Sequence, residues 1–567
     1  MLLPLVLLFL AAPAFAKICD VRDFGARGDG ISLDTPAIAS AIAACVKEGG
    51  GTVYFSAGRY VIGTLQLHSH IHLYLESGAT LMGSHDIRQY LPSPPFGFAR
   101  DYGVNITGEG VLLGMIVAKN ADDVSIDGHG AIDGQAETFM VHEAHGGGDY
   151  LKENVRNGDK YEAAMSNMEY GPIEPHNRPG TMLVFFHCTN VQLHGITLHQ
   201  SPNWTLHLQD VEGADISDIQ ILNDQKVPNN DGIDCMQCRH VRISDCNIIT
   251  GDDGFAIVAS ENVNVSNCSV SSRSAAIRLE STQLSTFTGI TMDTNRGIGI
   301  FASDNQNQEV RPTENVIFSD IAIRTRLIPG GWWGKAEPIY IAVQSCAPGT
   351  TCPNRVRNVV FRNITAEAEN GALLWGGEGT PIEGVEIDGL RLHMLTPEPQ
   401  WSEAVGGNLD LRWTVSTPRF GIVKSEIPAL YAKRIDGLRM RDVQVDWPTA
   451  PGLPDYYSDG IKIEDFNDLT IDDFAGRQAQ AASGAAISAA ISLVDGTGVA
   501  ITNSRAMPGT STFLLLDKVD GRRVFVNYDV KAAAKVIAPA TMRFDTQIGV
   551  PATARKPATR AAAKPKP

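Results

Sequence analysis

Residues 240–270 read HVRISDCNIITGDDGFAIVASENVNVSNCSV, and this stretch decides the fold. It holds two copies of one pattern, HVRISDCNI from residue 240 and NVNVSNCSV from residue 262, in which β-branched residues alternate with other residues up to an Asn or Asp. Similar units begin at residues 190, 213 and 315. A period of two is typical of a strand with one buried face. The chain is therefore predicted to repeat short strands.

The spacing of these units selects one architecture. The units at 190, 213, 240 and 262 begin 23, 27 and 22 residues apart, and each is too short to bury its apolar face alone. Such units stack into a solenoid, and strands that recur once per coil form parallel sheets. We predict an all-β protein, a right-handed parallel β-helix. A β-propeller would need about 40 to 50 residues per blade, and a β-sandwich would repeat less regularly.

Composition excludes several classes of function. The 567 residues include 55 Gly and 30 Pro, 7% are aromatic, and the formal net charge is −17. This charge argues against binding to nucleic acid or to an anionic membrane surface. The sequence contains no phosphate-binding loop, nucleotide fingerprint or Ser-His-Asp signature. No cofactor and no metal are expected.

The two ends of the chain have their own signals. Residues 1–16, MLLPLVLLFLAAPAFA, are apolar and end in an A-x-A cleavage signature, which predicts a signal peptide and a secreted or periplasmic protein. The alternative is a short membrane anchor, although the apolar run is short for a membrane span. Residues 546–567 are basic and rich in Pro and Ala, and are predicted to form a disordered tail. After removal of the signal peptide no membrane insertion is expected.

Between these ends we predict a single β-helix domain at residues 17–545. Its first element is a short helix in DTPAIASAIAACVKE, with Asp34 or Thr35 as N-cap, Pro36 at the first position, and Ile38, Ile42, Cys45 and Val46 on one face. The helix would cap the open end of the solenoid. Two segments break the repeat and are predicted as loop insertions, near 140–178 and 395–430. Cys346 and Cys352 bracket a short Pro/Gly loop that a disulfide would close.

Three carboxylates lie one repeat apart. Asp231 in NNDG precedes Asp252 by 21 residues, about one coil, and Asp253 follows directly in GDDG. On neighbouring coils these groups should meet at one sheet edge, and the flanking Gly251 and Gly254 would let both Asp252 and Asp253 face outward. Crowded carboxylates repel and raise at least one pKa. A protonated and an ionised carboxyl in one cleft suit glycoside hydrolysis. The alternative is that NNDG and GDDG are ordinary coil turns.

Several longer motifs together resemble glycoside hydrolase family 28, the polygalacturonase and rhamnogalacturonase group. They include IDGHGAIDGQ, SPNWTLHLQDVEGADISDIQI, NNDGIDC and GDDGFAI, and the resemblance covers roughly residues 18 to 300. It implies a right-handed β-helix and inverting hydrolysis of pectic α-glycosidic bonds without metal. It also implies that Asp252 is the general acid, that Asp231 and Asp253 hold and deprotonate the attacking water, and that Asn229 binds at the same site.

The sequence departs from the family downstream of the paired aspartates. Polygalacturonases carry a Gly-His-Gly motif whose His supports the acid, and Arg273 stands near that position here and is a candidate for substrate binding. They then carry Arg-Ile-Lys, which binds a galacturonate carboxylate, whereas NRGIGIFASD has Gly299 and Phe301 at the cationic places. Losing an ion pair to a ligand carboxylate costs about 1.5–3 kcal/mol. These departures argue against homogalacturonan as the substrate.

Five further residues are candidates for substrate binding. Arg278 would face the cleft or be an ordinary surface Arg, and Asp304 would line the next coil or be a turn residue. Trp332, Trp333 and Glu337 lie in the Gly-rich segment GWWGKAEPIYI, where exposed tryptophans would stack on sugar rings, or pack under the loop.

The sequence therefore predicts an exported inverting glycoside hydrolase with a polysaccharide or oligosaccharide substrate. Pectic or related plant cell-wall glycans fit best, with a rhamnogalacturonan-type or side-chain sugar favoured over homogalacturonan. A polysaccharide lyase that requires calcium, and a non-catalytic glycan-binding β-helix, remain the alternatives. A monomer is expected.

Overall fold

The computed structural model describes residues 17–91, 114–145, 150–303, 310–346, 349, 352–414, 421–448, 453–479, 488–520, 524–529 and 531–539. The predicted signal peptide and basic tail lie outside these residues. The chain divides into two compact units, unit 1 with residues 1–146 and 168–273, and unit 2 with residues 147–167 and 274–567. The extent of the predicted single domain stays a prediction. Within the described part, no helix is both long and apolar enough to cross a membrane.

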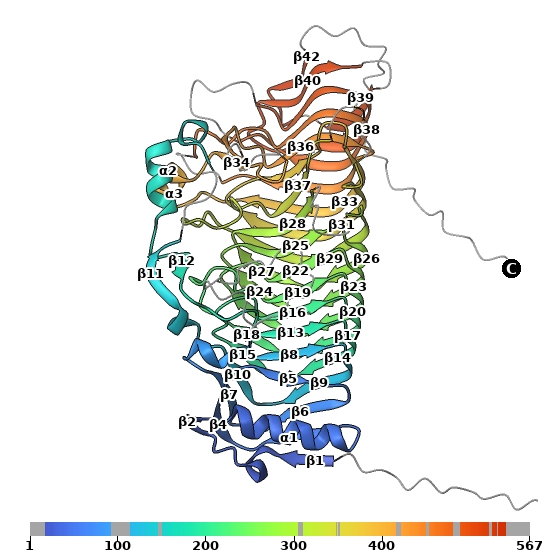
Figure 1. Ribbon diagram of the computed structural model, residues 1–567. Helices are drawn as coiled ribbons and strands as arrows, with labels where there is room; N and C mark the ends of the chain where they lie inside the picture. Colours follow the sequence, from blue (N-terminus) through green and yellow to red (C-terminus); the bar gives the residue numbers. More distant parts are fainter. Residues whose placement is uncertain are drawn as a thin grey trace, which may run out of the picture. The chain divides into compact units, whose positions relative to one another are not determined.

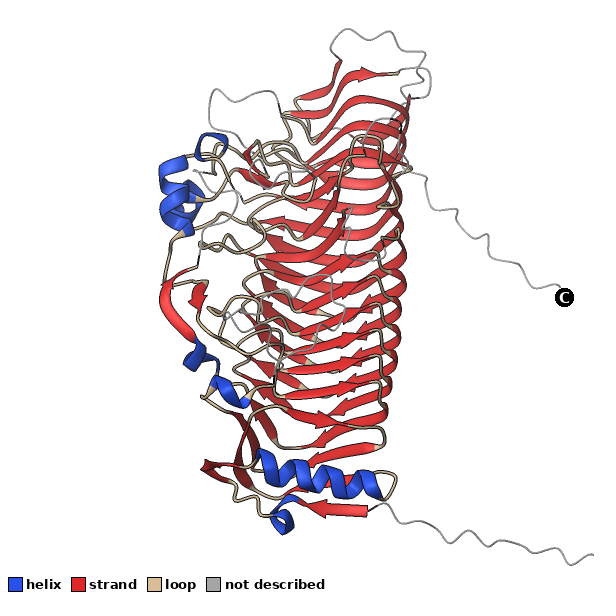
Figure 2. Cartoon of the chain, viewed as in Figure 1, coloured by secondary structure: helices blue, strands red, loops and turns tan. Residues whose placement is uncertain are grey.

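Unit 1 is built from parallel strands that pair in three stacks (Figures 1 and 2). The first stack pairs in the order β1 (Lys17–Asp20), β3 (Gly51–Phe55), β6 (Ile71–Leu75), β9 (Asp122–Gly128), β14 (Thr189–His194), β17 (Glu212–Ser217), β20 (Arg239–Ser244) and β23 (Glu261–Ser266). The second contains β2 (Asp29–Leu33), β4 (Gly58–Ile62), β7 (Ala79–Gly83), β10 (Ala131–Asp133), β15 (Thr197–His199), β18 (Gln220–Leu222), β21 (Asn247–Thr250) and β24 (Ser269–Ser272). The third contains β5 (Leu65–Leu67), β8 (Ile116–Lys119), β13 (Leu183–Phe186), β16 (Leu206–Gln209), β19 (Ile233–Met236) and β22 (Phe255–Val258).

Unit 2 repeats this parallel pairing with longer strands. One series is β25 (Ala275–Glu280), β28 (Arg296–Ala302), β30 (Ile339–Val343), β32 (Ala372–Trp375), β36 (Leu430–Asp436), β38 (Ile461–Gly476), β39 (Ile491–Ala506), β40 (Thr512–Val519) and β42 (Lys535–Pro539). The other strands are β26 (Gln283–Thr288), β27 (Thr291–Thr294), β29 (Thr313–Thr325), β31 (Val356–Ala368), β33 (Ile382–Met394), β37 (Arg439–Asp446) and β41 (Val524–Asp529). The predicted right-handed parallel β-helix is confirmed.

The core of unit 1 forms because alternate residues of each strand point inward. Leu208, Cys235 and Ile257 occupy equivalent positions on β16, β19 and β22, and all three are fully buried. Stacking like residues in register buries apolar area that one coil could not bury alone. Cys246 and Cys268 are likewise buried and form no disulfide.

The Asn and Asp residues of the repeat lie at the corners of the coils. Asp218, Asp245 and Asn267 follow β17, β20 and β23, and each has a positive φ, between 53° and 56°. Asn and Asp tolerate this left-handed conformation better than other residues with a side chain. The polar residue in each unit of the repeat is therefore a requirement of the turn.

A helix covers the first coil of unit 1. The helix α1 (Thr35–Lys47) has Asp34 as N-cap and Pro in its first turn, and it packs against β1, β3 and β5. It buries Ile38, Ala41, Ile42 and Cys45, and a disulfide joins Cys45 to Cys19. The prediction that Val46 faces the core is wrong, because its side chain is 38% exposed. The short helices η1 (Val21–Phe24) and η2 (Ile87–Gln89) also belong to unit 1.

Both predicted insertions contain ordered elements. The first holds β11 (Met140–Ala144), η4 (Lys152–Asn154), α2 (Gly158–Met165) and β12 (Ile173–Pro175), with β11 and β12 antiparallel, and η3 (Ala136–Phe139) directly precedes it. The second holds α3 (Pro399–Ala404) and the antiparallel pair β34 (Asn408–Asp410) and β35 (Ile422–Lys424). In unit 2, α2 packs against α3 around a buried cluster that includes Tyr161, Met165 and Val405.

Candidate active site

The three carboxylates come from two turns of unit 1 that lead into paired strands. Asp231 precedes β19 and Asp253 precedes β22, and the two strands pair with Ile233 opposite Phe255. The backbone N–H of Gly232 donates to the carbonyl of Asp253 at 2.9 Å. Asp231 is therefore equivalent to Asp253 on the next coil, 22 residues later, and Asp252 is the extra acid of the second turn.

One buried amide ties the two turns together. The side-chain oxygen of Asn230 accepts the backbone N–H of Gly251 at 2.7 Å and that of Asp252 at 3.3 Å, while its Nδ2 donates to the carbonyl of Asp224 at 2.8 Å. Asn230 is fully buried. Gly251 lets the second turn pass close to the backbone of Val227, because a Cβ at position 251 would lie 2.4 Å from the carbonyl oxygen of Val227. The spacing of the acids is thus set by a backbone-to-side-chain clamp.

Asn229 and a buried arginine hold the first turn. Asn229 has a positive φ of 55°, and its backbone N–H and Nδ2 donate to Asp252 Oδ2 at 3.3 and 3.4 Å. Its Oδ1 accepts from Arg178 Nη2 at 3.0 Å. Arg178 Nη1 also donates to the carbonyls of Pro202 and Pro228, at 3.0 and 2.7 Å. Arg178 fixes the shape of the turn that carries Asp231.

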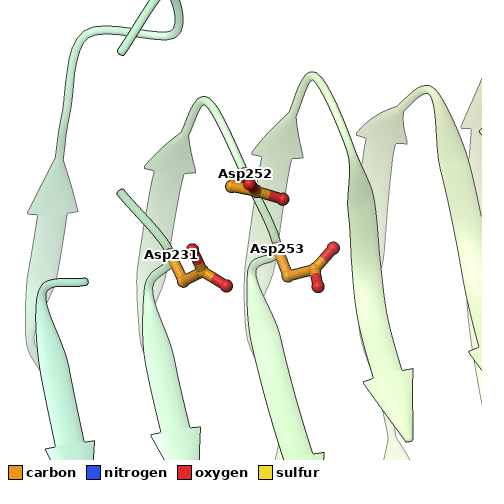
Figure 3. Close-up of side chains that lie close together, drawn as sticks. All are labelled: Asp231, Asp252 and Asp253. Carbon is orange, nitrogen blue, oxygen red and sulfur yellow. The ribbon is translucent and has the colours of Figure 1, made fainter. Parts of the chain in front are cut away.

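The acids form one cluster. An oxygen from each of Asp231, Asp252 and Asp253 lies within 4.8 Å of the others, and the side chains gather at adjacent turns (Figure 3). They are 6%, 8% and 7% exposed. Burial, followed by the charges of Asp252, Asp234 and Asp253, raises the pKa of Asp231 well above its usual range. Asp231 therefore keeps its proton at pH values where an ordinary Asp has lost it.

Arg178 is a buried cation, 3% exposed, that interacts electrostatically with Asp231 and Asp252. Burial lowers the pKa of Arg178 to about 10, while the charges of Asp231 and Asp252 oppose that shift. Arg178 remains charged at neutral pH and offsets part of the repulsion among the acids. The arrangement combines a protonated carboxyl, further carboxyl groups and a compensating cation, which is what general acid–base chemistry requires.

The cluster could also accept a divalent cation, because three carboxylate oxygens come within 4.8 Å of one another. Calcium takes about six to eight oxygen ligands, and the carboxylates supply the first of these. A test with a chelator therefore belongs with any assay of the site.

The other predicted site residues fall in different places. Arg273 is half-buried in unit 1, with its guanidinium 5.4 Å from the ring centroid of Tyr170, and its position beside Asp252 stays a prediction. In unit 2, Arg278 has a side chain 20% exposed and donates to Glu280 Oε2 at 3.1 Å. Trp333 is 39% exposed. Asp304 lies outside the described residues.

Two predicted substrate contacts are buried instead. Trp332 is 3% exposed, so it packs under its loop, as the alternative interpretation held. Glu337 is fully buried and accepts Arg296 Nε and Nη2, each at 3.2 Å. The prediction that Glu337 contacts substrate is wrong, because its carboxylate is fully buried and both of its oxygens accept from Arg296. The pair neutralises a charge that would be costly to leave unpaired in the core. Cys346 and Cys352 form a disulfide, with Cα atoms 5.8 Å apart.

Three residues of the site were not predicted from the sequence, namely Arg178, Asn230 and Asp234. Arg178 lies at the end of a polar insertion and looks like a surface residue. Asn230 occupies the middle of NND, where turn preference alone accounts for an Asn. Asp234 follows in an apolar strand and is 1% exposed. Of the three, only Asp234 could have been noticed, because a charged residue in an otherwise apolar strand is unusual.

Removing the clamp should disturb the site more than the fold. We expect Asn230→Ala to leave the N–H groups of Gly251 and Asp252 without their acceptor, to lower the free energy of unfolding by about 1–3 kcal/mol, and to reduce kcat about 10²-fold through misplaced acids. Urea unfolding and initial rates measure both. The control is Asn247→Ala, at an exposed Asn whose side-chain oxygen accepts from Ser269 Oγ at 2.7 Å. Equal effects of the two substitutions would contradict the clamp.

Comparison with known proteins supports the resemblance. Residues 104–273 match the family model for glycosyl hydrolases family 28. A probable polygalacturonase of Vitis vinifera is 32% identical over 249 residues, which cover 43% of this chain and 44% of that protein. The chain thus spans less than half the length of this curated relative. The predicted resemblance to the family is confirmed for this segment.

Solved structures support the fold. A polygalacturonase from Erwinia carotovora ssp. carotovora matches with a TM-score of 0.50 and 21% identity, over 68% of this chain and 95% of that one. A family 28 exopolygalacturonase from Yersinia enterocolitica matches with a TM-score of 0.50 and 17% identity, over 82% of this chain and 80% of that one. At such identities the likeness establishes the β-helix and nothing finer.

Proposed function

We propose that this chain, which carries a glycosyl hydrolase family 28 segment at residues 104–273, is an exported enzyme that hydrolyses α-glycosidic bonds in pectic or related glycans. The observation that carries the proposal is the cluster of Asp231, Asp252 and Asp253, brought together by two paired turns and held by Asn230 and Arg178. Hydrolysis of a glycosidic bond needs a proton for the leaving oxygen and a base for the attacking water.

In the proposed mechanism Asp252 delivers the proton to the leaving oxygen, and Asp253 deprotonates the water. The raised pKa of Asp231 argues that this carboxyl holds a proton in the unliganded protein, so it is a poor base there. Because Asp231 and Asp252 interact, the proton belongs to the pair rather than to either residue alone. Asp231 thus positions the water and keeps a proton available to Asp252, while Asn229 orients Asp252 through its two donors.

The proposed substrate is a rhamnogalacturonan-type glycan or a side-chain sugar. Gly299 and Phe301 occupy alternate positions on β28, where the resemblance leads one to expect cations for a galacturonate carboxylate. The net charge of −17 supplies no attraction to a polymer in which every ring is charged.

A substrate panel tests the proposal. The mature protein is incubated with homogalacturonan, rhamnogalacturonan and neutral pectic side chains, with EDTA or with calcium, and products are followed by proton NMR and by absorbance of unsaturated sugars. We expect hydrolysis of a non-homogalacturonan glycan, unaffected by EDTA. Unsaturated products that appear only with calcium would replace the proposal by a lyase, and no turnover on any glycan would favour a non-catalytic binding protein.

The first anomer released decides the stereochemistry. The resemblance implies inversion, so an α-linkage should yield the β-anomer first. The carboxylate oxygens come within 4.8 Å of one another, closer than the roughly 6.5–9.5 Å between carboxyl groups of most inverting enzymes. Initial release of the α-anomer would contradict single-step inversion. It would indicate a retaining double displacement, for which closely spaced carboxyl groups are typical.

The pH profile should report the shared proton. The charge of Asp234 is one cause of the raised pKa of Asp231. The substitution Asp234→Asn removes that charge, so the pKa of Asp231 falls and the proton is lost at a lower pH. The alkaline limb of kcat/KM is therefore expected to move to lower pH, with activity on the acid side changed less than about twofold. An alkaline limb that stays in place while Asp234→Asn folds normally would contradict the role of Asp231.

A further inference from the structure

Unit 2 contains an aromatic cluster that the hydrolytic mechanism does not use. Trp333 and Trp413 have ring centroids 5.8 Å apart, and Phe301 lies 4.8 Å from Trp413. Trp413 comes from the segment 395–430 predicted as an insertion, while Phe301 lies on β28. Positions 301, 333 and 413, which are 32 and 80 residues apart in sequence, thus meet in one aromatic cluster.

The indole of Trp333 stacks on an arginine. The guanidinium of Arg412 lies 3.9 Å from the centroid of its ring. Arg412 is itself fixed, because its Nε and Nη2 donate to the two oxygens of the fully buried Asp410 at 2.9 and 2.6 Å. A side chain already stacked on an immobile cation loses little freedom when a ligand binds to its exposed part.

Trp333 is also unusual in its exposure. It is 39% exposed, and it is the one aromatic residue among the exposed large hydrophobic side chains of the described residues. A single exposed apolar residue needs no explanation by itself. Here, however, the exposed indole lies beside a second, half-buried indole and stacks on an arginine of a buried ion pair, so its orientation is fixed by the protein.

The charges around the cluster are already matched within the protein. Arg278 lies 5.2 Å from the ring centroid of Trp413, and its guanidinium donates to the buried Glu280. Arg412 is paired with Asp410. The cluster therefore offers aromatic faces, and its cations are engaged with carboxylates of the chain. A ligand with apolar C–H faces and hydroxyl groups fits this surface, and a carboxylate gains less from it.

We propose that Trp333 and Trp413 form a saccharide-binding platform that takes an uncharged sugar ring. The inference rests on the proposed function in one respect, since it names the sugar class that the same enzyme binds. In this arrangement the C–H face of a pyranose or furanose ring stacks on the exposed indole of Trp333, and Trp413 borders the ring.

Binding to a catalytically silenced full-length protein tests the platform apart from the chemistry. With Asp252→Asn as the parent, titration calorimetry and tryptophan fluorescence measure the Kd of a neutral arabino-oligosaccharide, a rhamnogalacturonan oligosaccharide and trigalacturonate. We expect Trp333→Ala and Trp413→Ala each to weaken binding of the first two about tenfold, and Trp333→Phe to weaken it less than about threefold. Trigalacturonate should bind more weakly than either in the parent.

The matched control is Trp375→Ala, because Trp375 is a half-buried indole of unit 2 that also has cations near its ring, with Lys433 Nζ at 5.0 Å. Its Kd should be that of the parent. The platform is overturned if Trp333→Ala and Trp413→Ala bind as the parent does with unchanged melting temperature, if only Trp375→Ala weakens binding, or if the parent binds no glycan of the panel. If the wild-type protein binds a glycan through Trp333 and Trp413 but does not hydrolyse it, the platform is supported and the hydrolase proposal is contradicted.

Discussion

The substitution Asp252→Asn is expected to lower kcat about 10³-fold while the fold and glycan binding persist. The amide cannot donate a proton to the leaving oxygen, yet it is nearly the same size as the carboxyl. The melting temperature should not fall, because the change removes one charge from a cluster of three buried carboxyl groups. Initial rates at saturating substrate, the Kd of the bound glycan and thermal unfolding measure the three effects.

A corner aspartate provides the control for this prediction. Asp245 is exposed, has a φ of 56° and follows β20 in the same unit. Asn adopts this conformation readily, so Asp245→Asn should keep both kcat and stability. Equal activity of the two variants would mean that GDDG is an ordinary coil turn.

An activated substrate identifies the donor. Aryl glycosides with a good leaving group need little protonation, so an enzyme without its general acid should lose far less activity on them than on the natural glycan. The proposal expects this pattern for Asp252→Asn. If Asp231→Asn shows it instead, the proton carried by Asp231 in the unliganded protein is the one that is transferred.

The second large effect concerns the buried ion network of unit 2. Glu337→Ala is expected to destabilise the protein by about 3–5 kcal/mol, because it removes one of the two carboxylates that Arg296 pairs with in the core. Arg296 is fully buried and donates to Glu337 at 3.2 Å and to Asp410 at 3.0 Å. Lys335 is 3% exposed, and its backbone N–H donates to Glu337 at 2.7 Å. Chemical and thermal unfolding measure the loss.

A surface pair of the same unit is the matched control. Glu367 accepts from Arg324 at 2.6 Å, with side chains 44% and 53% exposed. Since solvent screens such pairs, Glu367→Ala should cost about 0–1 kcal/mol. A loss for Glu337→Ala no larger than this would show that the network does not stabilise the fold.

The fold was predictable from sequence because each coil repeats a local rule. Alternation with a period of two marks the strands, and an Asn or Asp marks the corner, as at Asp245 and Asn267. The capping helix was also local, with Asp34 and Pro36 at its start. The misplaced Val46 has a simple cause, because the apolar stripe of a helix is broad and the packed part of it depends on neighbouring strands.

The site was predictable only where its residues lie one coil apart in the sequence. Asp231 and Asp252 could be brought together from their spacing, although the register pairs Asp231 with Asp253. Arg178 could not, since it approaches Asn229 from 51 positions earlier in the chain. The same holds for Arg296 and Asp410, 114 positions apart, whose pairing depends on an insertion. Contacts of this kind leave no periodic trace in the sequence.

The clamp formed by Asn230 also determines which residues must stay together when the coding sequence recombines. It joins two turns whose acids are separated by a single coil, from Asp231 to Asp252. A recombination crossover inside that coil would separate Asn230 and Asp231 from Asp252 and Asp253, whereas a crossover outside it would transfer all four residues as one block.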